Sequence, residues 1–191
     1  MPGFTYDQSL GEIKRVTTGG TSTVDDFTCR AGTVRGSGSL AGERALVQKA
    51  VLGGKDETSV RIRVPVATFD CGKRRMNEDL YRALQAKAHP FIEYELASAE
   101  LIGNAGQDGA YRLRARGRLT IAGATRDVEI VLDGERLHDG RFQGRGRLPL
   151  QMTDFGIEPP SALLGLVRAH DDITVRFKLV AAPEDVQARN N

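Results

Sequence analysis

Tryptophan is absent from this chain of 191 residues, cysteine occurs only twice and histidine only three times. No apolar run approaches the ~18 residues of a membrane-spanning helix, so none is predicted. The first residues, MPGFTYDQSL, lack the charged and then apolar pattern of a secretory signal segment. If the protein is exported, that segment has been removed or lies outside this sequence.

The charge balance gives little support to a nucleic-acid-binding protein. The chain has 27 Lys and Arg against 25 Asp and Glu, a net charge of +2, whereas nucleic-acid binders usually carry a larger, clustered basic excess. One stretch, YRLRARGRLTI (111–121), has arginine at every second position. We interpret it as a strand whose apolar residues face inward, with Arg112, Arg114 and Arg116 exposed to solvent.

Sequence motifs for catalysis and for metal or cofactor binding are also scarce. There is no P-loop, no dinucleotide-binding glycine pattern and no serine nucleophile elbow. The three histidines, His89, His138 and His170, fall at an expected helix end or in expected turns, where a solvated role is commoner than catalysis. Asp171 and Asp172 precede a strand pattern, which is more typical of a turn than of a cation site. We therefore predict no catalytic residue, no metal site and no cofactor.

The two cysteines, Cys29 and Cys71, allow two interpretations. A disulfide between them would close a loop of about 43 residues and contribute ~4 kcal/mol in the chain-entropy model. Two reduced, buried thiols fit the composition equally well. Neither cysteine has a further cysteine or a histidine at metal-ligand spacing, so a zinc site is not expected.

Alternation of apolar and polar residues with a period of two dominates the chain and predicts half-buried β-strands. Asn-Gly-like and Asp-Gly turn signals separate these strands, as in hairpins. Little helix interrupts them, which argues against a parallel α/β sheet. The clearest alternating segments are 60–66, 91–96, 111–121, 127–132, 142–152 and 172–179.

These strands predict an all-β fold in a single domain spanning 1–191. We expect an antiparallel β-barrel of about eight strands, because closing the sheet removes its exposed edges. Two short helices are predicted beside it, over 77–87 with Asn77 as the capping residue and over 161–168 with Ser161 as the cap. The tail from about 181 to 191 is expected to fray.

Several positions that the alternation turns inward are occupied by very small residues, namely Ala115, Gly117, Gly144 and Gly146. Glycine within a strand can mark a bend or a close approach of the backbone. Alternatively, two such patches leave an unfilled volume, which apolar walls would make suitable for an apolar ligand. The candidates for those walls are Tyr94, Leu96, Leu113, Leu119, Ile130, Leu148, Leu150, Leu164 and Phe177.

Two motifs resemble a known family. The segment GRLTIAGATRDVEIVLDG (117–134) resembles the pattern G-x-L-T-I-x-G-x-T-[KR]-x-V of YceI-like proteins, and LPLQMTDFGI (148–157) is similar to their Asp-Phe-Gly-Ile signature. The segments 70–96 and 161–180 resemble the family more loosely. The segment GGTSTVDDFTC (19–29) has no histidine, which many members carry in the first strand.

The resemblance covers about residues 20–180 and implies a lipocalin-like barrel around a long isoprenoid amphiphile. The implied ligand is a polyprenyl phosphate or an isoprenoid quinone, bound without catalysis for sequestration or transport. Typical members are exported to the periplasm, and that location favours the disulfide between Cys29 and Cys71. We expect an isoprenoid lipid or quinone as partner, no nucleic acid and no stable membrane insertion, and we leave a homodimer open.

Two other functions remain as alternatives. The first is an enzyme acting on a small or lipidic substrate at the barrel mouth, with Asp154 or His170 as the candidate residue. The surroundings of Asp154, TDFG, instead suit a turn in which the carboxylate caps backbone N–H groups. The second is a packed barrel that serves only as an interaction surface.

Overall fold

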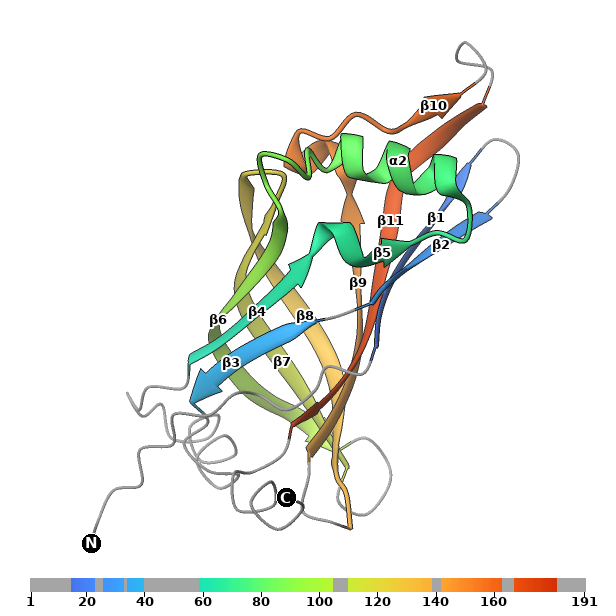
Figure 1. The fold of residues 1–191 in the computed structure, drawn as a ribbon. Helices are drawn as coiled ribbons and strands as arrows, with labels where there is room; N and C mark the ends of the chain where they lie inside the picture. The colour runs from blue at the N-terminus through green and yellow to red at the C-terminus, as the bar shows by residue number, and fades with distance from the viewer. Residues whose placement is uncertain are drawn as a thin grey trace, which may run out of the picture.

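The structure, a computed structural model, describes residues 15–22, 26–32, 34–39, 59–104, 110–138, 142–162 and 167–181. These residues form an antiparallel β-sheet with one α-helix (Figure 1). No helix in these ranges is long and apolar enough to cross a membrane. The elements are β1 (Arg15–Ser22), β2 (Asp26–Ala31), β3 (Arg35–Ser39), β4 (Ser59–Pro65), η1 (Val66–Thr68), β5 (Phe69–Asp70), α2 (Arg74–Ala83), β6 (Phe91–Asn104), β7 (Ala110–Ile121), β8 (Ala124–Arg136), β9 (Phe142–Gln151), η2 (Met152–Phe155), β10 (Ser161–Ala162) and β11 (Val167–Ala181).

The sheet closes on itself because two stretches of the chain, β2–β3 and β4–β5, each contribute strands to both of its ends. Hydrogen-bonded neighbours follow the order β3-β4-β6-β7-β8-β9-β11-β1-β2-β5. The chain runs directly from β2 into β3, and from β4 through η1 into β5, so β3 pairs with β4 while β2 pairs with β5. Between these two pairings, the Gly32 N–H donates to the Thr68 carbonyl at 2.8 Å. The predicted lipocalin-like antiparallel barrel of about eight strands is confirmed.

Helix α2 lies across one end of the barrel (Figure 1). A packed core fills that end of the barrel and contacts the helix. Leu80 and Tyr81 of α2 contact this core from above. Fully burying a large apolar side chain contributes about 1.5–3 kcal/mol, so this cluster fixes helix and sheet together. Its buried members are Val66, Leu84, Ala115, Leu119, Ile121, Ile130, Leu148, Met152, Phe155 and Ile157.

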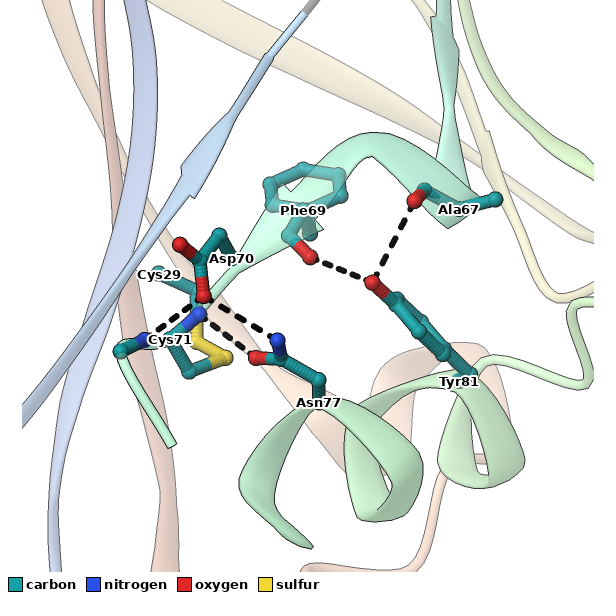
Figure 2. The surroundings of a disulfide bond; sticks show 8 residues. Cys29, Ala67, Phe69, Asp70, Cys71, Asn77 and Tyr81 are labelled. Carbon is teal, nitrogen blue, oxygen red and sulfur yellow. Dashed lines mark hydrogen bonds between the residues drawn. A yellow bond between two sulfur atoms is a disulfide. The ribbon is translucent and has the colours of Figure 1, made fainter. Parts of the chain in front are cut away.

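The first predicted helix is present, but its start was predicted wrongly. The helix begins at Arg74, and Asn77 lies within it rather than at its cap. The Asn77 side chain faces the preceding segment, where its Oδ1 accepts from the Cys71 N–H at 2.7 Å and its Nδ2 donates to Asp70 at 3.1 Å (Figure 2). The true N-cap, Lys73, makes no side-chain capping bond, so the sequence carries no capping signal there.

The predicted helix over 161–168 is wrong where the structure describes it. Ser161 and Ala162 form β10, which pairs with the first residues of β11. A helix of about two turns is marginal alone, so ladder hydrogen bonds to a neighbouring strand outweigh a short apolar spacing. Residue Leu164, a predicted wall residue, lies outside the described residues.

Candidate ligand-binding interior

Strand β7 alternates between the inside and the outside of the barrel. Gly117 and Leu119 are buried, whereas Arg112 and Arg116 are exposed, as predicted. Arg114 was also predicted to be exposed, but it is only half-buried. The polar side chains of β7 therefore face outward, and its inward-facing side chains are apolar.

The arginines of β7 are paired with acids on both neighbouring strands. Sequence analysis treated them as simply solvated, because pairing depends on the register between strands. The hydrogen bonds from Arg61 and Arg118 lower the pKa of Glu95, and the bond to Glu100 raises the pKa of Arg114. The contacts are Arg112 Nε–Asp133 Oδ1 at 2.9 Å, Arg114 Nη1–Glu100 Oε1 at 2.6 Å, Arg116 Nε–Glu129 Oε2 at 3.0 Å and Arg118 Nη2–Glu95 Oε2 at 2.6 Å.

A β-bulge in β6 changes which side chains turn inward. Leu96 lies opposite Gly117, but Ser98 lies opposite Arg116, so Ala97 is an extra residue on this strand. Before the bulge the even-numbered residues face inward. After it Ala99 and Leu101 do, until a second register shift between Leu101 and Gly103 places Gly103 opposite the outward Arg112. The inward set on β6 is therefore Ile92, Tyr94, Leu96, Ala99 and Leu101.

The three inward glycines are covered by larger side chains of neighbouring strands. A Cβ at Gly117 would lie 2.7 Å from Cζ and Oη of Tyr94, and one at Gly146 would lie 2.4 Å from Cζ of Phe177. A Cβ at Gly144 would lie 3.3 Å from atoms of Leu132 and Leu179. These positions are therefore glycine because side chains of neighbouring strands approach them closely. Those side chains fill the space directly above the glycines.

Packing within the barrel loosens away from α2. Near the helix, inward residues such as Leu119, Ile121 and Met152 are buried. Farther along the strands, many inward side chains are only half-buried. A fully packed barrel would bury them. This half-buried set comprises Tyr94, Leu96, Leu101, Leu113, Leu132, Val175, Phe177 and Leu179.

The interior has very little polar character. The half-buried set carries no formal charge, and Arg126, which lies opposite Leu119 by register, is exposed. The hydroxyl of Tyr94 is buried and has no hydrogen-bond partner in the described part of the chain. Burial raises the pKa of Tyr94 to about 12, so the hydroxyl keeps its proton at neutral pH. It is a donor aimed into an apolar environment.

The disulfide between Cys29 and Cys71 is present, with an S–S distance of 2.00 Å (Figure 2). It joins β2 to the segment that leads into α2. In the same region, the Tyr81 hydroxyl of α2 donates to the Phe69 carbonyl at 2.6 Å. The hydrogen bond from Asn77 also lowers the pKa of Asp70. A covalent bond and several hydrogen bonds therefore hold the covering helix on the barrel.

The candidate catalytic residues lie outside this interior. Asp154 and His170 are both exposed, and His170 lies within β11 rather than in the predicted turn. The capping role expected of Asp154 belongs to Asp171, whose carboxylate accepts from the N–H of Thr153 at 2.9 Å and from its hydroxyl at 2.6 Å. These bonds lower the pKa of Asp171. Among the described residues, no group of three His, Cys, Asp or Glu could hold a metal ion.

Comparison with known proteins places this geometry in context. The chain resembles the Burkholderia cenocepacia protein BcnA with 18% identity and a TM-score of 0.67, covering 88% of this chain and 96% of that one. A structure described as a polyisoprenoid binding domain from Saccharophagus degradans, implicated in plant cell wall breakdown, has 14% identity and a TM-score of 0.66, with coverage of 92% and 98%. The YceI protein of Campylobacter jejuni has 19% identity and a TM-score of 0.50, with coverage of 67% and 74%.

These likenesses establish a shared fold. No curated protein matches the sequence significantly. The model of the YceI-like domain matches residues 7–181, which is most of the chain. This protein therefore belongs to the YceI-like domain family.

Proposed function

We propose that the barrel binds the hydrocarbon tail of an isoprenoid amphiphile, a polyprenyl phosphate or an isoprenoid quinone, and sequesters or transports it without catalysis. The observation that carries this proposal is the half-buried, uncharged set of inward side chains on the strands away from α2. Buried Ala115, Leu119, Ile130 and Leu148 would form the floor of the site. Its wall would comprise Tyr94, Leu96, Leu113, Leu150 and Phe177, beside Gly117, Gly144 and Gly146, with Leu164 as a further candidate.

The driving force would be burial of apolar surface. Each Å² removed from water contributes about 25 cal/mol, before the cost of association is subtracted. An isoprenoid tail has a large apolar surface and needs no polar partner along its length. The Tyr94 hydroxyl is placed to donate a hydrogen bond to a ligand oxygen, which would relieve its unpaired burial.

Two further findings support the proposal. One structural neighbour is described as a polyisoprenoid binding domain, which supports a ligand of the same class for the interior proposed here. The disulfide fits an oxidising compartment, so we place the protein in the periplasm or outside the cell.

The test is to identify what the protein carries. The full chain, purified from its own host without detergent, would be studied by native mass spectrometry and then extracted for lipids. We expect a bound prenyl lipid, and we expect delipidated protein to take up a polyprenyl phosphate or an isoprenoid quinone saturably. Binding of neither probe would contradict the proposal and favour the interaction-surface alternative. Turnover of a probe would favour the enzyme.

A further inference from the structure

Tyr94 of β6 lies at the boundary between the packed end of the barrel and the half-buried inward side chains. Its register partner on β7 is Leu119, which is buried in the core. The next inward residue on β6, Leu96, lies opposite Gly117, on the side away from α2. Strand β6 starts at the α2 end of the barrel (Figure 1). A chain molecule that occupies the half-buried set would therefore reach Tyr94 with its innermost end.

The hydroxyl of Tyr94 lies over the inward side of Gly117. A Cβ on Gly117 would lie 2.7 Å from both Cζ and Oη of Tyr94. The oxygen is buried, yet it has no hydrogen-bond partner in the part of the chain that the structure describes. A buried polar group that stays unpaired costs the full penalty of its desolvation. Because the ring packs against the core, folding accounts for the ring of Tyr94 but not for its oxygen.

The surroundings of this hydroxyl suit a neutral oxygen better than an anion. The half-buried set carries no formal charge. Ile62, the register neighbour of Tyr94 on β4, is also half-buried and apolar. An ionised phosphate placed here would lose far more solvation free energy than one hydroxyl restores, because no cation of this set could pair with it. A carbonyl oxygen needs only a single donor.

The end of the barrel away from α2 is out of reach of Tyr94. Tyr111 lies near the start of β7, on the same inward side as Leu119, and is half-buried. The strand between Tyr111 and Leu119 spans about 26 Å, since each strand residue adds roughly 3.3 Å. A headgroup held at that end could not accept from Tyr94, whose hydroxyl would then face hydrocarbon.

We infer that an isoprenoid quinone enters the barrel with its ring foremost, and that a ring carbonyl accepts a hydrogen bond from the Tyr94 hydroxyl. This inference rests on the proposed function, which it narrows to a neutral headgroup and one direction of binding. The prenyl tail then lies along the half-buried set toward the end away from α2. A polyprenyl phosphate would instead enter tail first and keep its charged group outside.

Three probes with the same prenyl tail test this inference on the full chain. They are a prenyl benzoquinone, the matching prenylbenzene, which lacks both carbonyls, and the polyprenyl phosphate. Tyr94→Phe should bind the quinone roughly tenfold more weakly than the parent does, and the other two probes no more weakly. The infrared band of an isotope-labelled ring carbonyl should lie at lower frequency in the parent than in Tyr94→Phe, because a hydrogen bond weakens the C=O bond. A merely structural role of Tyr94 would not move that band.

The matched control is Tyr111→Phe, which removes the same atom near the opposite end of the barrel and should leave both quinone affinity and the carbonyl band unchanged. Thermal melts would establish that both variants fold. Weaker quinone binding by Tyr111→Phe but not by Tyr94→Phe would overturn the inference and put the headgroup at the far end. Equal weakening of all three probes by Tyr94→Phe would also overturn it.

The prenylbenzene separates this inference from the function on which it rests. If the parent binds prenylbenzene and the quinone but Tyr94→Phe changes neither affinity nor the carbonyl band, the direction of binding is wrong and the lipid-binding function stands. If none of the three probes binds the parent, the proposed function and this inference fall together.

Discussion

The ring of Tyr94 on β6 occupies the place that a side chain at position 117 of β7 would need. A Cβ at Gly117 would lie 2.7 Å from the Tyr94 ring and 2.3 Å from the carbonyl oxygen of Glu95. The second contact is with backbone, which cannot move aside as a flexible side chain can. Gly117 is therefore required for the close approach of the two strands.

Gly117→Ala should destabilise the fold by about 3 kcal/mol, because overpacking forces shifts in both strands. Urea unfolding followed by circular dichroism measures this. Gly103→Ala on β6 is the control, since a Cβ there meets nothing within 4 Å, and it should change stability by less than about 0.5 kcal/mol. A neutral Gly117→Ala would contradict the observed packing.

Tyr94→Phe should leave the fold intact and stabilise the ligand-free protein by about 1 kcal/mol, because it removes a buried hydroxyl that has no partner. The same change should weaken binding of an oxygen-bearing prenyl ligand if that hydroxyl donates to it. Calorimetric titration of both proteins with an isoprenoid quinone measures the second effect. A less stable Phe variant would indicate that the hydroxyl is satisfied in the native protein.

Unfolding at alkaline pH offers an independent test of the raised pKa of Tyr94. Its pKa rises from 10.0 to about 12 through burial, so the folded state holds this proton more tightly than the unfolded state does. The resulting stability is fully present below pH 10 and is lost as the pH rises through 10 to 12. The parent should lose more stability than Tyr94→Phe over this window, and identical profiles would contradict the shift.

Local patterns in the sequence predicted most of the strands correctly. Side chains alternate across a strand because of backbone geometry alone, so a stretch such as 111–121 reveals its two faces without knowledge of its neighbours. The solvent-facing side of that stretch was identified, but the acidic residues that pair with its arginines were not. The pairing of Arg116 with Glu129 depends on a register between β7 and β8 that no single strand encodes.

The same limit explains the other errors. The extra residue at Ala97 reverses the inward set on β6, and it becomes visible only when β7 is laid beside it. The glycines were open to two explanations because the side chain that covers each one comes from another strand. For Ser161, pairing with β11 outweighed the local helical spacing. Long-range pairing is the common element in these cases.

Breaking the disulfide should destabilise the fold and loosen α2. The bond between Cys29 and Cys71 has a sequence separation of 42, and such a loop is worth up to ~4 kcal/mol in the chain-entropy model. Urea unfolding of the parent with and without a reductant measures this, and Cys29→Ala/Cys71→Ala is the control that a reductant should not affect. Hydrogen exchange should rise first in α2, and an unchanged midpoint in reductant would contradict the prediction.

The position of the ligand can be tested by adding volume on one side of the wall. Leu113 of β7 faces inward and is half-buried, whereas Val131 on the adjacent strand β8 faces outward and is 43% exposed. Leu113→Trp should leave the secondary structure unchanged and reduce uptake of a prenyl lipid at least tenfold, because the larger ring occupies the space that the tail needs. Val131→Trp adds a similar ring outside the barrel and should bind like the parent. Gly117 is unsuitable for this purpose, since its substitution would damage the strands themselves. If Leu113→Trp folds and still takes up prenyl lipid as well as Val131→Trp does, the tail does not lie along β7.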